Sequence, residues 1–456
     1  MKGLIFTMAL AYGGAVMSLF RPFYGLLIYV CFAILRPEDM WPWSVQGGNF
    51  SRIIAGAMMG GWIWHICLTF VTGKGVSFRF GGGKLVVVLF TAFWLWSVFL
   101  SLGAIHQKIA WEYVESLAKI LLPFLVGMTT IDSVKKLKQL AWVIIVSQGY
   151  VAYELNMYYF GGYNKLRMDG FAGLDNNSVA ISLVTVIGLS AFMFLHVQKY
   201  WQKAIIAGCG AFMVHAVLFS FSRGGMVAMI SCGGVGFLLL KKTMRHYLAF
   251  LFAVVAVIYA AGPEVRDRFL RTFEKNNTGQ REASAQSRLD LWKDCWTVIK
   301  RDPFMGCAPN HWPTLAHRFG WERGKEAHSL WVQTATETGF PGIFMFAGFY
   351  LVCMGKLFLL ILRSKEDDDP WFSDNAKMVI ASLVGFAISA QFVSLEALEV
   401  PYYVALLGAA NLSVYSKERR RLAVEAIDAE YEADGYDEYG YDDGDELTDW
   451  TPIPVA

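Results

Sequence analysis

The chain has 456 residues, of which 55% are hydrophobic and 15% aromatic, and its mean hydropathy is +0.40. This is more apolar surface than a soluble domain can bury, which excludes a soluble globular protein and indicates a polytopic membrane protein. The net charge is only +2, so the positions of the charges are more informative than their sum. The seven cysteines lack CxxC spacing, which argues against a zinc site or a disulfide framework; a single disulfide between Cys295 and Cys307 stays open.

Apolar runs along the chain predict an all-α polytopic membrane protein with about twelve transmembrane helices and a large helical periplasmic loop. The prediction uses the roughly 20 apolar residues that a helix needs to cross a bilayer core. The first two runs are short, and thirteen full spans would put Lys2 outside, so these two could instead form a broken or partly inserted pair. The expected runs are 3–20, 22–35, 52–72, 85–103, 117–130, 138–157, 178–196, 203–221, 224–240, 246–262, 330–362, 377–395 and 399–415.

Basic connectors predict the orientation, because cytoplasmic loops retain Lys and Arg. If every run from 52 onward spans, "TGKGVSFRFGGGK", "SVKKLK", "VQKYWQK", "KKTMRH" and "SKERRR" all fall on one side. The opposite side receives "RPEDMWPWSVQGGNFSR", "GAIHQKIAWEY", the stretch 160–177, the turn at 222–225 and a long segment from about 263 to 328. In the inner membrane of a bacterium that side faces the periplasm.

These features divide the chain into four parts. Residues 1–262 and 329–415 are expected to form transmembrane helices, and 263–328 a periplasmic loop with amphipathic helices. Residues 416–456 are acidic, rich in tyrosine and without aliphatic periodicity, so we expect a disordered cytoplasmic tail.

The stretch "SRLDLWKDCWTVIKRDP" in the long loop predicts an amphipathic helix that ends before Pro303. Ser287 is expected to cap its first turn, which would place Arg288 beside unpaired backbone N–H groups at the positive end of the helix dipole. This arrangement attracts phosphate. The apolar stripe expected to rest on the membrane-side core is Leu289, Trp292, Trp296 and Ile299.

A second arginine, Arg223, stands in the turn "SRGG" between two apolar runs. Taken alone, Arg223 has a simple interpretation, in which its long side chain reaches to the membrane interface. Gly224 and Gly225 would, however, let a ligand approach the backbone closely. Together with Arg288 on the same side, Arg223 forms a hypothetical clamp for a diphosphate, since each guanidinium can bond two oxygens.

His328 lies where the outer segment re-enters the membrane, in "KEAHSLWVQTATETGFPGIFMF". A structural, hydrogen-bonded histidine is the simple interpretation. Beside an arginine clamp it could instead accept a proton from an incoming hydroxyl. No DxD, HExxH or Walker motif accompanies these residues, so metal, nucleotide-sugar and ATP chemistry find no support there, and no cofactor or nucleic-acid partner is expected.

Three motifs resemble the O-antigen ligase and polymerase superfamily of bacterial envelopes. They are "SRGG", "SRLDLW" with the following "DPFMGCAPNHW", and "HSLWVQTATETGFPG", in this order. The opening "RPFYGLLIYVCFAILRPEDMWPW" is similar more narrowly to the O-glycosylation ligases associated with exosortases. The resemblance covers roughly residues 1–415 and leaves the tail out.

The resemblance implies a metal-independent inverting glycosyltransferase in the inner membrane. It would move a glycan from an undecaprenyl diphosphate donor to an acceptor hydroxyl of lipid A-core, a protein or an exopolysaccharide on the periplasmic side. Arg223 and Arg288 would hold the diphosphate, and His328 would activate the acceptor. "KLRMDGFAGLDNNSVA" resembles a further family segment, and His311 stands where an aromatic residue is expected. The second-tier candidates are Arg167, Asn176, Asn177, Asn310 and His311.

Three alternatives stay open at this point. A repeat-unit polymerase of the same superfamily would use the same donor. A transporter of lipid-linked glycans would place its charges near the membrane midplane and often shows internal repeats, which this sequence lacks. A purely structural membrane scaffold would leave the charged outer loop unexplained.

Overall fold

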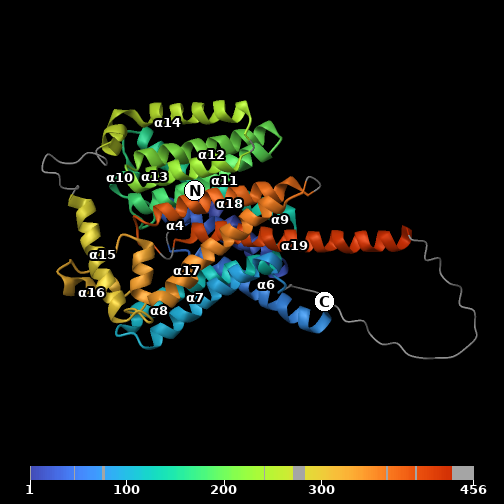
Figure 1. Ribbon diagram of the computed structural model, residues 1–456, viewed down its shortest axis with the longest axis horizontal. Coiled ribbons are helices and arrows are strands. Elements are labelled where there is room, and N and C mark those ends of the chain that lie inside the picture. Colours follow the sequence, from blue (N-terminus) through green and yellow to red (C-terminus); the bar gives the residue numbers. More distant parts are fainter. Residues whose placement is uncertain are drawn as a thin grey trace, which may run out of the picture. The chain divides into compact units, whose positions relative to one another are not determined.

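The computed structural model describes residues 2–45, 47–73, 78–240, 242–270, 283–365, 368–395 and 398–433 (Figure 1). The chain divides into two units, Met1–Tyr415 and Ser416–Ala456. All regular elements of the described residues are helices, and one isolated bridge joins Phe171 and Leu174. The described chain is therefore all-α, as predicted.

The N-terminal half contains the helices that precede the "SRGG" turn. A π-helical turn, η1 (Ala9–Gly13), interrupts the first run, so that α1 (Lys2–Met8) and α2 (Gly14–Phe20) follow one continuous helical path. The others in this half are α3 (Pro22–Leu35), α4 (Pro37–Met40), α5 (Pro42–Val45), α6 (Phe50–Thr72), η2 (Gly81–Gly83), α7 (Lys84–Leu102), α8 (Gln107–Thr130), α9 (Val134–Phe160), α10 (Lys165–Met168), α11 (Asn176–His196) and α12 (Tyr200–Phe219).

The C-terminal half begins with the helix that carries Arg223. Its last helix, α19 (Glu399–Ala433), runs from the first unit into the second. The helices before it are α13 (Arg223–Leu239), α14 (Met244–Leu270), α15 (Ala283–Arg301), α16 (Trp312–Leu315), η3 (Ala316–Phe319), α17 (Leu330–Arg363) and α18 (Pro370–Ser389). Residues 416–433, the first part of the expected disordered tail, are helical and belong to α19, and residues 434–456 lie outside the described residues.

Helices occupy all thirteen apolar runs expected from the sequence, but fewer of them qualify as membrane spans. α3 has only 14 residues, and α13 and the start of α14 (Met244–Tyr259) are also shorter than a full span. The expected count of about twelve spans is not confirmed. By length and composition, six helices of the described residues could cross a membrane: Gly3–Phe20, Phe50–Thr72, Gly81–Leu102, Asn176–His196, Tyr200–Phe219 and Leu330–Arg363.

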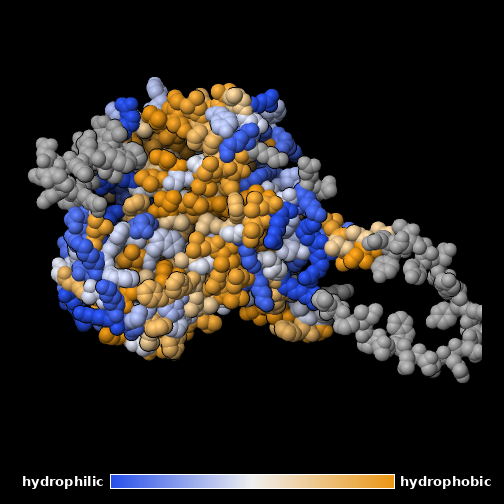
Figure 2. Space-filling model, in the orientation of Figure 1, coloured by the Kyte–Doolittle hydropathy of each residue, from blue (hydrophilic) through white to orange (hydrophobic). Residues whose placement is uncertain are grey.

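Helix α11 forms the centre of the bundle in the first unit. It packs against α9, α12, α13 and α18, and 78% of its apolar stretch is buried, compared with 28% for α12. Gly188 permits the close contact with α18, because a Cβ there would lie 2.8 Å from the backbone nitrogen of Ser382. Small residues allow helix backbones to approach in this way. Figure 2 shows hydrophobic residues across the middle of the face in view, and hydrophilic ones at the end where α15 and α16 lie.

Two glycine–proline breaks redirect the long helices α14 and α17. Gly262 precedes Pro263 and has φ 67°, and Gly339 lies two residues before Pro341 and has φ 66°. The missing amide hydrogen of proline and the left-handed glycine interrupt the helical hydrogen-bond ladder at both places. In α17 the break separates a short first part, residues 330–338, from a long apolar part that begins after Gly339.

Residues 291–327 fold around a small hydrophobic core of their own, here called the loop core, which is distinct from the core of the bundle. This core contains Leu291, Cys295, Trp312, Ala316 and Ala327. The predicted stripe of α15 is therefore only partly right: Ile299 is buried, but Trp296 is 47% exposed. Leu291 and Cys295 of α15 face the loop core, while Trp296 contacts the ring of Phe340 on α17.

The predicted start of α15 is wrong. The helix already includes Ala283, so Ser287 does not cap it and Arg288 lies beyond the first turn. Alanine and glutamine favour helix, and they extend it upstream of the serine. Cys295 and Cys307 are both free, and burial raises the pKa of the Cys295 thiol to about 12.

Candidate functional site

The first turns of α11 and α13 lie next to each other. Asn176 Nδ2 donates a hydrogen bond of 2.8 Å to the carbonyl oxygen of Ser220, just before the "SRGG" turn. A Cβ on Gly225 would lie 2.9 Å from Ala180 of α11. Each helix has a side-chain N-cap, Asp175 for α11 and Ser222 for α13.

The first turn of α17 joins this group through the segment that follows α18. The backbone nitrogen of Leu330 donates to the carbonyl oxygen of Ala390 at 2.8 Å, and that of Ser329 donates to Ser394 Oγ at 3.2 Å. Two residues after Ala390, the ring of Phe392 faces Gly224. Residues 390–394 therefore contact the start of both α13 and α17.

Arg223 is the first residue of α13 and is half-buried. The expectation that the two following glycines leave room for a ligand is wrong. A Cβ on Gly224 would lie 2.8 Å from the Phe392 ring, so both glycines serve helix packing. Phe221, just before the turn, has φ 56°, a left-handed conformation that costs energy in a bulky residue. The surrounding packing fixes the position from which Arg223 extends.

Two side chains hold the backbone of Ala327, the residue before His328, and so fix the position of the histidine. Trp292 Nε1 on α15 donates to the carbonyl oxygen of Ala327 at 2.9 Å, and the nitrogen of Ala327 donates to Gln333 Oε1 at 3.0 Å. His328 itself has φ 51°, again in the left-handed region. Two helices thus fix the histidine at the entry to α17.

Three charged groups act on the imidazole. Burial first, and then the positive charges of Lys325 and Arg288, lower the pKa of His328, while Asp175 opposes them. The charge of Arg288 thus acts on His328 despite the earlier start of α15. At neutral pH the imidazole is neutral and has a lone pair to accept a proton.

Two carboxylates at this site were missed by the sequence reasoning. Burial acts to raise the pKa of Asp175, but hydrogen bonds from Ser178 and Asn177 bring that pKa below its ordinary value. Burial and the charge of Asp175 raise the pKa of Glu326. In the sequence, a helix-capping pattern is the only local signal for Asp175, and Glu326 has no local signal.

The second-tier residues of the 164–177 stretch support the turn before Arg223. The guanidinium carbon of Arg167 lies 4.6 Å from the centre of the Phe221 ring, a cation–π contact. Asn176 bonds across to Ser220, as described above, whereas Asn177 bonds locally to Asp175 Oδ2 at 3.1 Å. Asn176 is thus the one of the two asparagines that links α11 to the turn.

Asn310 and His311 directly precede Trp312 of the loop core; Asn310 is exposed and His311 is buried. The buried Glu337 accepts hydrogen bonds from the backbone nitrogens of Asn310, at 2.7 Å, and of Trp312, at 3.2 Å. His311 Nε2 accepts from the nitrogen of His106 at 3.1 Å, so Nδ1, 2.7 Å from the oxygen of Pro309, carries the proton. Both ring nitrogens are engaged, which gives His311 a structural position. Among the described residues, no three His, Cys, Asp or Glu side chains are grouped as metal ligands would be.

Comparison with known proteins finds one family. Residues 208–347 match the O-antigen ligase family, which supports the O-antigen ligase and polymerase superfamily. The matched region contains Arg223, Arg288 and His328 and excludes Arg167 and Asn176. No curated protein matches the chain. The narrower likeness to exosortase-associated ligases is not confirmed.

Proposed function

We propose that this chain, with its O-antigen ligase domain, transfers a glycan from an undecaprenyl diphosphate donor to an acceptor hydroxyl. It would act in the inner membrane of a bacterium, with its site toward the periplasm. The observation that carries the proposal is the proximity of Arg288 to His328 beside the start of the helix bearing Arg223.

The arginines would act on the leaving group. A guanidinium donates paired, charge-assisted hydrogen bonds to phosphate oxygens. As the bond between the anomeric carbon and the diphosphate breaks, negative charge grows on the diphosphate. Bonds from Arg223 and Arg288 strengthen with that charge, which stabilises the transition state more than the bound donor.

His328 would act on the acceptor. The acceptor oxygen attacks the anomeric carbon opposite the diphosphate, so the configuration inverts, and the neutral imidazole takes the hydroxyl proton. Undecaprenyl diphosphate leaves with the bonding electron pair. The nearby carboxylate of Asp175 stabilises the imidazolium that forms.

A repeat-unit polymerase would perform the same displacement and differ only in its acceptor, another lipid-linked repeat. The shared donor makes donor binding uninformative for this choice. Transfer to a lipid-free acceptor favours a ligase, and chain growth on the carrier favours a polymerase.

The test is a transfer assay with the purified full-length chain in lipid nanodiscs. Undecaprenyl diphosphate-linked glycan is supplied with candidate acceptors, and glycan transfer and release of undecaprenyl diphosphate are followed. We expect His328→Ala to lower the transfer rate about 10²–10⁴-fold, the usual contribution of a general base. His317→Ala, an exposed histidine of the same outer segment, should retain the rate. Full transfer by His328→Ala contradicts its proposed role, and no transfer to any acceptor by the wild type contradicts the function.

A further inference from the structure

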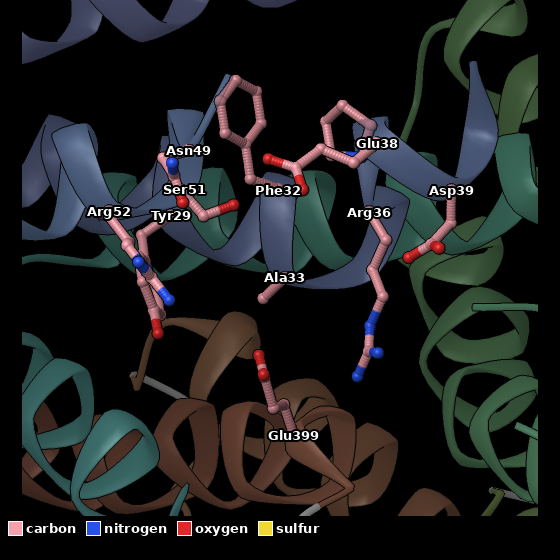
Figure 3. A pocket seen from close by; sticks show the side chains of 11 residues that line it. Tyr29, Phe32, Ala33, Arg36, Glu38, Asp39, Asn49, Ser51, Arg52 and Glu399 are labelled. Carbon is pink, nitrogen blue, oxygen red and sulfur yellow. The ribbon is translucent and has the colours of Figure 1, made fainter. Parts of the chain in front are cut away.

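A cavity of about 270 Å³ lies outside the family-matched region. Its wall is formed by α3, α4, the start of α6 and the start of α19. Figure 3 shows Glu399 reaching from α19 toward the wall formed by α3, with Arg36 on one side and Arg52 and Tyr29 on the other. Glu38 and Asp39 of α4 lie at its exposed edge.

The charged side chains around this cavity do not pair with one another. In the described part of the chain, none of Arg36, Glu38, Asp39, Arg52 and Glu399 makes an ion pair with another of the five. Arg36 bonds the backbone oxygen of Ala172, and Glu399 accepts from Tyr403. The two guanidinium groups and the carboxylates keep hydrogen-bonding capacity directed at the void.

The mixture of charges selects against ions as occupants. The two arginines attract a phosphate, but the three acidic side chains repel it more strongly. The same arginines repel a cation. A sugar fits this wall because each hydroxyl both donates, to a carboxylate, and accepts, from a guanidinium. The ring of Tyr29 adds apolar surface for the C–H face of a sugar ring.

The cavity is connected to the candidate transfer site through one arginine. Arg36 Nη1 donates at 3.1 Å to the oxygen of Ala172, three residues before Asp175, whose charge acts on His328. Ala172 has φ 54°, so this turn is held in a left-handed conformation. A ligand that binds Arg36 therefore lies beside the segment that leads into α11.

We propose that this cavity is a carbohydrate subsite that holds one neutral sugar unit near the transfer site. The inference rests on the proposed function, which makes the substrates glycans. The sugar belongs either to the donor glycan or to a glycan acceptor, since both present the same hydroxyl chemistry.

Direct binding tests the subsite without any transfer reaction. The full-length chain in nanodiscs is mixed with methyl glycosides of glucose, galactose and N-acetylglucosamine, and binding is followed by saturation-transfer NMR. We expect binding of at least one glycoside, weakened about tenfold or more in Glu399→Gln, which loses a charged hydrogen-bond acceptor. Ala33→Leu, which fills the cavity and changes no charge, should also weaken it. Glu112→Gln, an exposed position on α8, is the matched control and should bind like the wild type.

In the binding experiment, three results would overturn the subsite: no glycoside binds, both variants bind as the wild type does, or inorganic pyrophosphate displaces the glycoside. Glycoside binding by a chain that transfers no glycan would sink the proposed function and leave the subsite standing. In the transfer assay, Glu399→Gln should raise KM for only one substrate. A raised KM for the acceptor assigns the sugar to the acceptor, and a raised KM for the donor assigns it to the donor glycan. An unchanged KM for both contradicts the inference.

Discussion

At the scale of single residues, the pH dependence of transfer should report the charges around His328. The pKa of this histidine lies below its ordinary value of about 6.5, through burial and the charges of Lys325 and Arg288. Transfer should therefore be constant around neutral pH and fall only when the pH drops below that ordinary value. Lys325→Gln removes a positive neighbour and should move this acidic limb to higher pH. Asp175→Asn, which keeps a helix-capping side chain, should move it to lower pH. The measurement is kcat/KM against pH, and limbs that stay in place contradict the assignment of His328 as the base.

Trp292 is a positioning residue, because its indole N–H holds Ala327 next to the histidine. Trp292→Phe keeps the ring and removes the hydrogen bond, and we expect kcat to fall about tenfold with little change in KM. Trp296→Phe on the same helix is the matched control, since Trp296 is 47% exposed. A loss of the same size in both variants, or a loss confined to KM, would count against a role in positioning His328.

At the scale of elements, the break in α17 couples the membrane helix to the outer segment. The nitrogen of Phe340 donates to the oxygen of Pro303 at 2.8 Å, and a Cβ on Gly339 would lie 2.3 Å from the oxygen of Phe304. Gly339→Ala should lower the melting temperature in detergent, because the left-handed backbone alone costs about 1–2 kcal/mol and the clash adds to it. Gly355→Ala, in open space on the same helix, should leave the melting temperature unchanged or raise it. Equal effects of the two substitutions would refute this account of the break.

The helices could be predicted from hydropathy alone, since every expected apolar run became helical. The start of α15 could not, because the sequence offers both the Ser287 cap and helix-favouring residues upstream of it, and the helix took the second. The glycines after Arg223 have two explanations in the sequence, ligand access and packing, and only the position of Phe392 decides between them. Glu326 and the cavity around Glu399 depend on segments far apart in the sequence, and no local pattern identifies them.

At the scale of the whole molecule, the basic connectors predict that Lys135 and the transfer site face opposite sides of the membrane. Cysteine labelling in cells tests this, because Cys67 is the one exposed cysteine among the described residues and can be replaced by serine. In that background, Arg323→Cys should react with a membrane-impermeant thiol reagent once the outer membrane is permeable. Lys135→Cys should react only after the inner membrane is opened. Labelling of both variants, or of Lys135→Cys alone, in cells with an intact inner membrane would contradict the proposed orientation.

In the proposed mechanism, the guanidinium groups of Arg223 and Arg288 hold one diphosphate beside His328. Its most direct test is a double-mutant cycle on Arg223 and Arg288, with release of undecaprenyl diphosphate as the readout and exposed Arg318→Ala as the control. We expect each alanine variant to lower kcat by about 10²–10³-fold, and the double variant to lose less than the product, with a coupling of at least about 0.5 kcal/mol. A full release rate in either single variant would contradict the claim.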